Sequence, residues 1–121
     1  IQTRYPALPV FDYVLKGRLL DFYREEKADR QTLGYPPFEL FTKVTLTGRK
    51  EKISALMADL NQALGDYRPI TFPAFTQPKG KYRLHLLLKM PPWRWPDPKV
   101  LAVLRSLSPN FTTVVDPDTI L

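Results

Sequence analysis

Apolar side chains recur along this chain at two different spacings, which divide it into two parts. Over the first 34 residues the spacing is helical, and it predicts one helix at 10–15 and a second at 18–33. Gly34 follows the last turn of the second helix, where glycine commonly ends a helix, and the prolines that come next cannot continue it. We therefore expect a helical linker over residues 1–34 and a separate domain over residues 35–121.

The second part contains strands as well as helices, because its apolar residues alternate with polar ones in several short runs. Pro73 lies in the strand predicted at 69–75 and confines that strand to the edge of a sheet. In order, the predicted elements are a strand at 38–47, a helix at 50–64, strands at 69–75 and 81–89, a helix that begins at Asp97-Pro98 and a strand at 111–115. The order β-α-β-β-α-β predicts an α+β, ferredoxin-like domain, in which an antiparallel sheet has both helices on one face.

The strand predicted at 81–89 has two unlike sides. Its leucines occupy alternate positions and are expected to face the helices, while the positions between them carry cations and a histidine. Together with the matching side of the first strand, the face turned away from the helices is expected to present Phe41, Lys43, Arg83, His85 and Lys89. Cations beside an aromatic ring are typical of surfaces that bind single-stranded nucleic acid.

A plainer interpretation of this face remains open. The sheets of RNA-recognition modules carry aromatics at fixed alternate positions, whereas residues 80–86 contain one aromatic, Tyr82, on the side expected to face the helices. An amphipathic strand with a solvated basic side and no ligand is therefore the alternative.

The net charge of the chain is +6, and the excess is concentrated in one quarter of it. Residues 79–105 contain seven Lys and Arg against one acidic residue, Asp97. This concentration favours a polyanion as partner, since each phosphate that a cation neutralises releases counterions. A basic surface that serves only solubility is the alternative. If the partner is DNA, the residues expected to contact it are Lys43, Lys79, Lys81, Arg83, His85 and Lys89.

The composition excludes several classes of protein. The chain has no cysteine and one histidine, which excludes disulfides, thiol nucleophiles, Cys-based metal sites and three-His metal sites. Its apolar runs are too short to span a membrane, and it has no glycine-rich phosphate loop. We expect no catalytic residue and no metal ligand here. Because it starts at Ile1, with neither a signal segment nor an initiator methionine, we expect a fragment of a longer protein.

The most unusual local sequence is Trp93-Arg94-Trp95, which lies between Pro92 and Pro96. An arginine between two tryptophans on a proline-stiffened loop suits recognition of an aromatic or carboxylate-bearing peptide, or the stacking of bases. The alternative is structural, with one tryptophan covering the core.

The chain around Gly34 carries a more specific pattern. Glu25-Glu26, Arg30 and Gly34-Tyr35-Pro36-Pro37-Phe38 form E-E-x-x-x-R-x-x-x-G-Y-P-P-F, which resembles the C-terminal part of the primosomal protein N′ (PriA) family of replication-restart helicases. Three further segments are similar to this family in the same order: Ile1-Gln2-Thr3 with Pro6 and Pro9, Gly80-Lys81-Tyr82-Arg83 with Leu86-Leu87-Leu88-Lys89, and Val115-Asp116-Pro117 with Leu121. The resemblance covers essentially the whole chain.

This resemblance implies a C-terminal domain with the fold of a small-subunit ribosomal protein, in agreement with the ferredoxin-like order. In the family the domain helps to bind branched and single-stranded DNA, and it contributes to a site for the acidic tail of single-stranded DNA-binding protein. Arg94 is the nearest match to a basic residue of that site, flanked by Trp93 and Trp95, although the chain departs from the family pattern at residues 91–98.

The resemblance also implies what this segment lacks. The family is an ATP-dependent 3′-5′ DNA helicase, but its ATPase motifs and zinc-binding cysteines lie upstream, so ATP, Mg²⁺ and zinc are not expected to bind here. A bacterial, cytoplasmic and nucleoid-associated protein is implied. The alternative function is a free-standing ferredoxin-like module that binds RNA or ribosomal components. ATPase motifs encoded upstream of Ile1 would establish the helicase, and an initiator methionine directly before Ile1 would exclude it.

Overall fold

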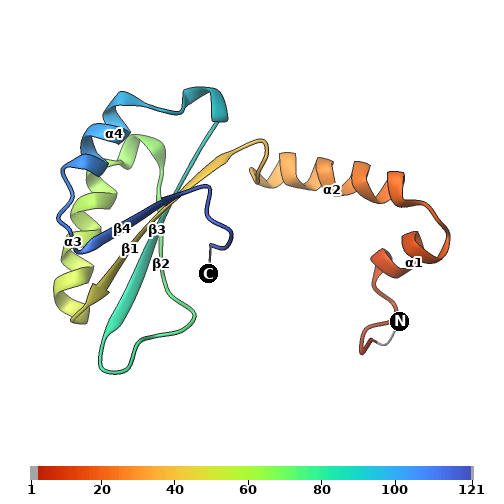
Figure 1. Ribbon diagram of the computed structural model, residues 1–121, viewed down its shortest axis with the longest axis horizontal. Helices are drawn as coiled ribbons and strands as arrows, with labels where there is room; N and C mark the ends of the chain where they lie inside the picture. Colours follow the sequence, from red (N-terminus) through yellow and green to blue (C-terminus); the bar gives the residue numbers. More distant parts are fainter. Residues whose placement is uncertain (1–2, 121) are drawn as a thin grey trace. The chain divides into compact units, whose positions relative to one another are not determined.

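The computed structural model describes residues 3–120 of the chain, whose course is drawn in Figure 1. By their internal contacts the residues form two units, Ile1–Tyr35 and Pro36–Leu121, and each is described here by itself. Ile1 and Gln2 of the first family motif, and Leu121 of the last, lie outside the described residues.

The first unit consists of helices α1 (Pro9–Leu15) and α2 (Leu19–Leu33), close to the predicted bounds. Gly34 ends α2 in the left-handed conformation, with φ 62° and ψ 54°, and the next amide donates a hydrogen bond to the Arg30 carbonyl at 2.8 Å. This is the glycine stop that the sequence predicts. Neither helix contains a buried residue. The pair is held by contacts between aromatic rings, with the centroids of Tyr13 and Phe22 5.9 Å apart.

The second unit is an antiparallel sheet with helices α3 and α4 on one side of it, as Figure 1 shows. Its elements are β1 (Leu40–Gly48), α3 (Lys50–Ala63), the 3-10 turn η1 (Gly65–Tyr67), β2 (Ile70–Pro73), β3 (Tyr82–Met90), the 3-10 turn η2 (Pro92–Arg94), α4 (Pro98–Arg105) and β4 (Phe111–Val115). The strands lie in the order β2-β3-β1-β4, and every neighbouring pair is antiparallel. The predicted α+β class is confirmed, and the arrangement is compatible with a ferredoxin-like fold.

The core lies between the sheet and the two helices. Every second residue of β1 and β3 points into it, and α3 and α4 contribute the opposing apolar side chains. Its most buried members are Val44, Leu46, Met57, Leu64, Leu86, Leu88, Met90 and Val100. The leucines of β3 therefore face the helices, as their alternation predicts. Thr42 is also fully buried, and its Oγ1 has no hydrogen-bond partner among the described residues.

Two local features join the helices to the sheet. Gly48 ends β1 directly before α3, and a Cβ added there would lie 2.9 Å from Cγ2 of the buried Ile53, so the close approach of strand and helix requires glycine. Asp97 begins α4 as the predicted N-cap, since its side chain accepts hydrogen bonds from the amides of Lys99 and Val100. Within residues 3–120 no helix combines the length and the apolar character that crossing a membrane requires.

The strand bounds differ slightly from the predicted ones. β1 begins at Leu40 instead of residue 38, because the tandem prolines are followed by turns. β2 is shorter than predicted and stops at Pro73. Beyond it the Ala74 amide still donates to the Arg83 carbonyl, but the Arg83 amide donates to the Gln77 side chain instead of to the backbone of a strand. β2 does lie at the edge of the sheet, as expected.

Candidate nucleic-acid interface

The strand register brings the predicted basic residues onto the sheet face that lies away from α3 and α4. Thr45 lies opposite His85, and Thr47 lies opposite Arg83. Lys43 occupies the same side of β1 two residues earlier. These residues alternate with the core leucines, so all of them lie on what we call the open face: the side of β1 and β3 opposite the helices.

The open face is not uniformly exposed, because His85 is buried within it. Its side chain lies on the predicted face, but the residue retains 5% of its accessible surface. The Phe72 ring of β2 lies 5.6 Å from the imidazole, and Thr45 Oγ1 and His85 Nδ1 are hydrogen-bonded at 2.8 Å. Burial, followed by the charges of Lys43 and Arg83, lowers the pKa of His85 below its ordinary value. The imidazole is therefore held neutral.

A cavity of about 320 Å³ lies on the open face beside His85. Hydroxyl groups from three stretches of chain line it, namely those of Thr45, Thr47, Thr76 and Thr112. Lys43 and Arg83 add two cationic side chains to the wall. No acidic residue is among the described residues that line it. The cavity is thus surrounded by groups that donate hydrogen bonds to an anion.

The cations on this face are held in place by neighbouring groups. Arg83 Nε donates to Thr47 Oγ1 at 3.2 Å, so the guanidinium stays beside the cavity. Lys43 Nζ donates to the Thr119 carbonyl at 2.5 Å, which brings the segment after β4 to the same face. Farther along β3, Lys89 Nζ lies 5.0 Å from the centroid of the Phe41 ring.

One rim of the cavity is the segment that follows β2. Ala74 is buried, and its amide donates to the Arg83 carbonyl at 3.0 Å. The Gln77 side chain then donates from Nε2 to the Ala74 carbonyl at 2.7 Å and accepts at Oε1 from the Arg83 amide at 2.6 Å. We call this set of bonds the Gln77 clasp. It holds the intervening Phe75, which lines the cavity and is 88% exposed.

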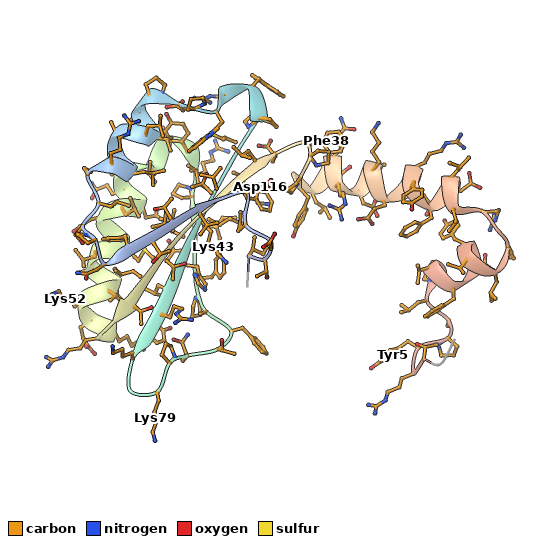
Figure 2. The ribbon with its side chains drawn as sticks, in the orientation of Figure 1. Tyr5, Phe38, Lys43, Lys52, Lys79 and Asp116 are labelled. Atoms are coloured by element: carbon orange, nitrogen blue, oxygen red, sulfur yellow. The ribbon has the colours of Figure 1, made fainter. Side chains whose placement is uncertain are left out.

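The remaining predicted DNA contacts lie elsewhere. Lys79 and Lys81 are exposed on the turn between β2 and β3, and Figure 2 shows Lys79 pointing away from the tip of that turn. The structure therefore places Lys43, Arg83 and His85 at the cavity, while Lys89 and the two turn lysines extend the basic surface along β3.

The two tryptophans of the 92–96 loop have different surroundings. Trp93 is 83% exposed, whereas Trp95 packs against the core, as the structural alternative predicts for one of the pair. Between them, the Arg94 guanidinium lies 5.4 Å from the Tyr67 ring centroid and 3.3 Å from Asp97 Oδ2. The hydrogen bond from Tyr67 Oη, at 2.8 Å, is the main cause that lowers the pKa of Asp97 and raises that of Tyr67.

Sequence reasoning missed the threonines of the cavity, Phe75 and Gln77. Threonine is common in strands, so its hydroxyls give no signal until the register shows that they converge. Phe75 reads as the end of an apolar segment, whereas in the structure it is exposed beside the cavity. Among residues 3–120 there is no group of three His, Cys, Asp or Glu side chains that could hold a metal ion.

The chain is similar to two replication restart proteins. It is 29% identical over 127 residues to the replication restart protein PriA of Thermotoga maritima, a match that covers 99% of this chain and 17% of that protein. It is 33% identical over 119 residues to the replication restart protein PriA of Treponema pallidum, with 92% of this chain and 18% of that protein covered. The chain thus spans less than a fifth of the length of these curated relatives. No protein-family model matches it.

Proposed function

From the similarity to these relatives, which confirms the predicted resemblance to the C-terminal domain of PriA, we propose a function. The chain is the DNA-binding C-terminal domain of a replication-restart helicase. It corresponds to a small part of such a protein, so we assign no catalytic step to it. ATP hydrolysis with Mg²⁺, and zinc binding, belong in this proposal to the remainder of the protein. The alternative of a free-standing RNA- or ribosome-binding module gains no support from the relatives.

The observation that carries this proposal is the basic open face. Residues 36–121 contain twelve of the eighteen Lys and Arg but seven of the twelve Asp and Glu. Within that excess, Lys43, Arg83 and Lys89 lie on one face of the sheet, and Lys79 and Lys81 extend it at the turn. Bases and phosphates of an unpaired strand can contact an open sheet of this kind, whereas the opposite face is covered by helices.

Salt dependence tests this assignment. If three to five of these cations contact phosphates, the logarithm of the binding constant for single-stranded DNA falls against the logarithm of salt concentration with a slope of roughly −2 to −4. Fluorescence anisotropy with forked and single-stranded oligonucleotides measures it. Replacing Lys81, Arg83 and Lys89 by alanine is expected to flatten the slope by about 2.

A matched triple variant controls for the loss of charge alone. Lys52, Arg68 and Arg105 are exposed and lie on or near the helices instead of the open face. Their replacement by alanine removes the same charge and is expected to change the slope less than the open-face triple does. Equal effects of the two triples, or an affinity independent of salt, would contradict the open face as the contact surface.

A second candidate function is favoured by the exposure of Trp93. We propose that Trp93 and Arg94 bind the acidic tail of single-stranded DNA-binding protein, the ligand that the family resemblance implies. A guanidinium can pair with a terminal carboxylate, and an exposed indole can cover an aromatic ring. Arg94 keeps about half of its side-chain surface exposed beside Asp97, so a carboxylate has access to it. Trp95 has a structural part, because it packs against the core.

Titration of a tail peptide into the full-length helicase tests this candidate. Arg94→Ala is expected to weaken binding by roughly 1.5–3 kcal/mol, the typical value of a hydrogen bond to a charged group. Trp93→Ala is expected to weaken it as well, while Tyr5→Ala removes an exposed aromatic of the first unit and serves as control. Unchanged affinity in both loop variants would show that the peptide is bound elsewhere.

A further inference from the structure

We propose that the cavity on the open face is a subsite for one nucleotide of single-stranded DNA, in which Arg83, Lys43 and the threonine hydroxyls bind a phosphate while Phe75 stacks on the adjoining base. This inference rests on the proposed function and makes it more specific: it assigns one unpaired nucleotide to a defined place instead of a diffuse basic surface.

The lining of the cavity selects an anion. Arg83 and Lys43 are cationic, and Thr47, Thr76 and Thr112 supply neutral hydroxyl donors, while Thr45 is hydrogen-bonded to His85. Arg83 also has a planar guanidinium that suits bidentate contact with phosphate. Because no described lining residue is acidic, a cationic ligand would find no countercharge there. The volume of about 320 Å³ lies at the lower end of the range for small-ligand sites, about 300–1,000 Å³.

The position of Phe75 selects an unpaired base. A phenylalanine that is 88% exposed has its ring surface available for stacking. Since it lines the same cavity as Arg83, a nucleotide whose phosphate lies against the guanidinium can bring its base to this ring. In a duplex the bases are stacked on one another and do not offer a face, so the arrangement favours a single strand.

The Gln77 clasp makes this ring part of a preorganised site. Between Pro73 and Pro78, the clasp and the bond from the Ala74 amide tie the segment to the backbone of Arg83. The residue that stacks and the residue that binds phosphate are therefore fixed to each other through the main chain of β3. Gln77 is in this respect a positioning residue, which lowers the entropy lost when the nucleotide binds.

The test compares a single-stranded oligothymidine with a blunt duplex of the same length, by fluorescence anisotropy on the full chain at several salt concentrations. Phe75→Ala is expected to weaken single-strand binding roughly 5- to 150-fold, the usual range for loss of one stacked base, without changing the salt slope or the duplex affinity. Tyr5→Ala, which removes an exposed aromatic of the first unit, is the control and is expected to leave oligothymidine binding unchanged.

A double-mutant cycle tests the role of Gln77. Gln77→Ala is expected to weaken single-strand binding when Phe75 is present and to have no further effect in the Phe75→Ala background, because Gln77 acts through that ring. Additive losses would overturn the positioning role. Thermal melts show whether each variant is folded. Duplex binding is a second control, because a general destabilisation would lower it whereas the loss of one stacked base would not.

The phosphate half of the subsite has its own readout. Titration with thymidine 5′-monophosphate, followed by NMR, is expected to shift the methyl signals of Thr45, Thr47 and Thr112, and inorganic phosphate to shift the same signals. Thymidine without phosphate is expected to leave them in place. Shifts confined to other residues would overturn the phosphate site.

The outcomes distinguish this inference from the function on which it rests. If Phe75→Ala binds oligothymidine as the wild type does while the open-face charge triple binds more weakly, the nucleotide subsite is wrong and the DNA-binding function stands. If the unaltered chain binds neither oligothymidine nor duplex, both are wrong.

Discussion

The two faces of the sheet are built by the same strands but are buried in different ways. Leu86 and Leu87 are neighbours on β3 and point to opposite faces, and they retain 0% and 3% of their accessible surface. Leu86 is covered by the aliphatic side chains of the helices. On the other face, Phe41 and His85 are buried as well, although no helix is part of that layer within the second unit.

The difference shows that the open face is a second, smaller packed layer that keeps polar groups. The Phe72 ring lies beside His85. The segment before β3 is bonded to Arg83 through Ala74, and the segment after β4 is bonded to Lys43 through Thr119. The helix-covered face is packed mainly by apolar side chains, whereas on the open face polar side chains have partners and line a cavity that a ligand can enter. The following predictions test this comparison.

The largest effect is expected from the two neighbouring leucines. Leu86→Ala should lower the free energy of unfolding by about 3–5 kcal/mol, and Leu87→Ala by about 2–3 kcal/mol, because both leave a cavity but the open face can collapse more readily. Urea denaturation followed by tryptophan fluorescence measures both, since Trp95 packs against the core. A cost below about 1 kcal/mol for Leu87→Ala would show that the open face is not a packed layer.

Two threonines on opposite faces of β1 give the next largest effect, with opposite signs. Thr42→Val should stabilise the fold by about 1 kcal/mol, because it removes a buried hydroxyl that has no partner among the described residues. Thr45→Val should destabilise it by about 1 kcal/mol, because the bond to His85 is lost. A loss of stability in Thr42→Val would mean that its hydroxyl is satisfied in solution.

The pH dependence of stability is expected to follow His85. Burial, followed by the charges of Lys43 and Arg83, lowers the pKa of His85 in the folded state. At pH values between this pKa and the unfolded value of about 6.5, the unfolded state therefore binds more protons than the folded state. Stability should therefore fall as the pH is lowered from 7 through the unfolded pKa, and level off below the folded one. His85→Gln should flatten this part of the profile in melts between pH 5 and 7.5. A profile unchanged by the substitution would assign the pH effect to other groups.

The smallest effect is expected at an exposed ion pair between η1 and α4. Lys99 and Asp66 form an ion pair, but both side chains are more than half exposed, so solvent and salt screen it. Lys99→Ala should change the urea midpoint of unfolding by no more than experimental error. The Leu87→Ala and Thr45→Val substitutions on the open face should lower that midpoint. A clear loss at low salt would show that this pair contributes more than its exposure allows.

The features that the sequence predicts are those decided by residues close together along the chain. The alternation in 81–89 predicts which side of β3 faces the helices, and Asp97-Pro98 predicts the start of α4. The strand at Phe111–Val115 has the predicted bounds. In each case a local pattern is sufficient, because period and capping act over a few residues.

The depth of the open face could not be predicted in the same way. The burial of His85 depends on Phe72, which reaches it only through the pairing of β2 with β3. The difference between Trp93 and Trp95 likewise depends on how the η2 turn lies against the core. Alternation assigns a side of a strand, but the cover on that side comes from residues distant in the sequence.

The Gln77 clasp also has a consequence for how copies of this protein meet. Just beyond Pro73 the Arg83 carbonyl accepts from the Ala74 amide at 3.0 Å, and an unprotected N–H or C=O at such an edge is where sheets of different molecules join and aggregate. The Gln77 amide covers both groups of Arg83, accepting from the N–H at 2.6 Å and lying within 3.3 Å of the carbonyl. A side chain that imitates a peptide group thus protects this stretch of β3, beside the exposed Phe75, against pairing with the sheet of another molecule.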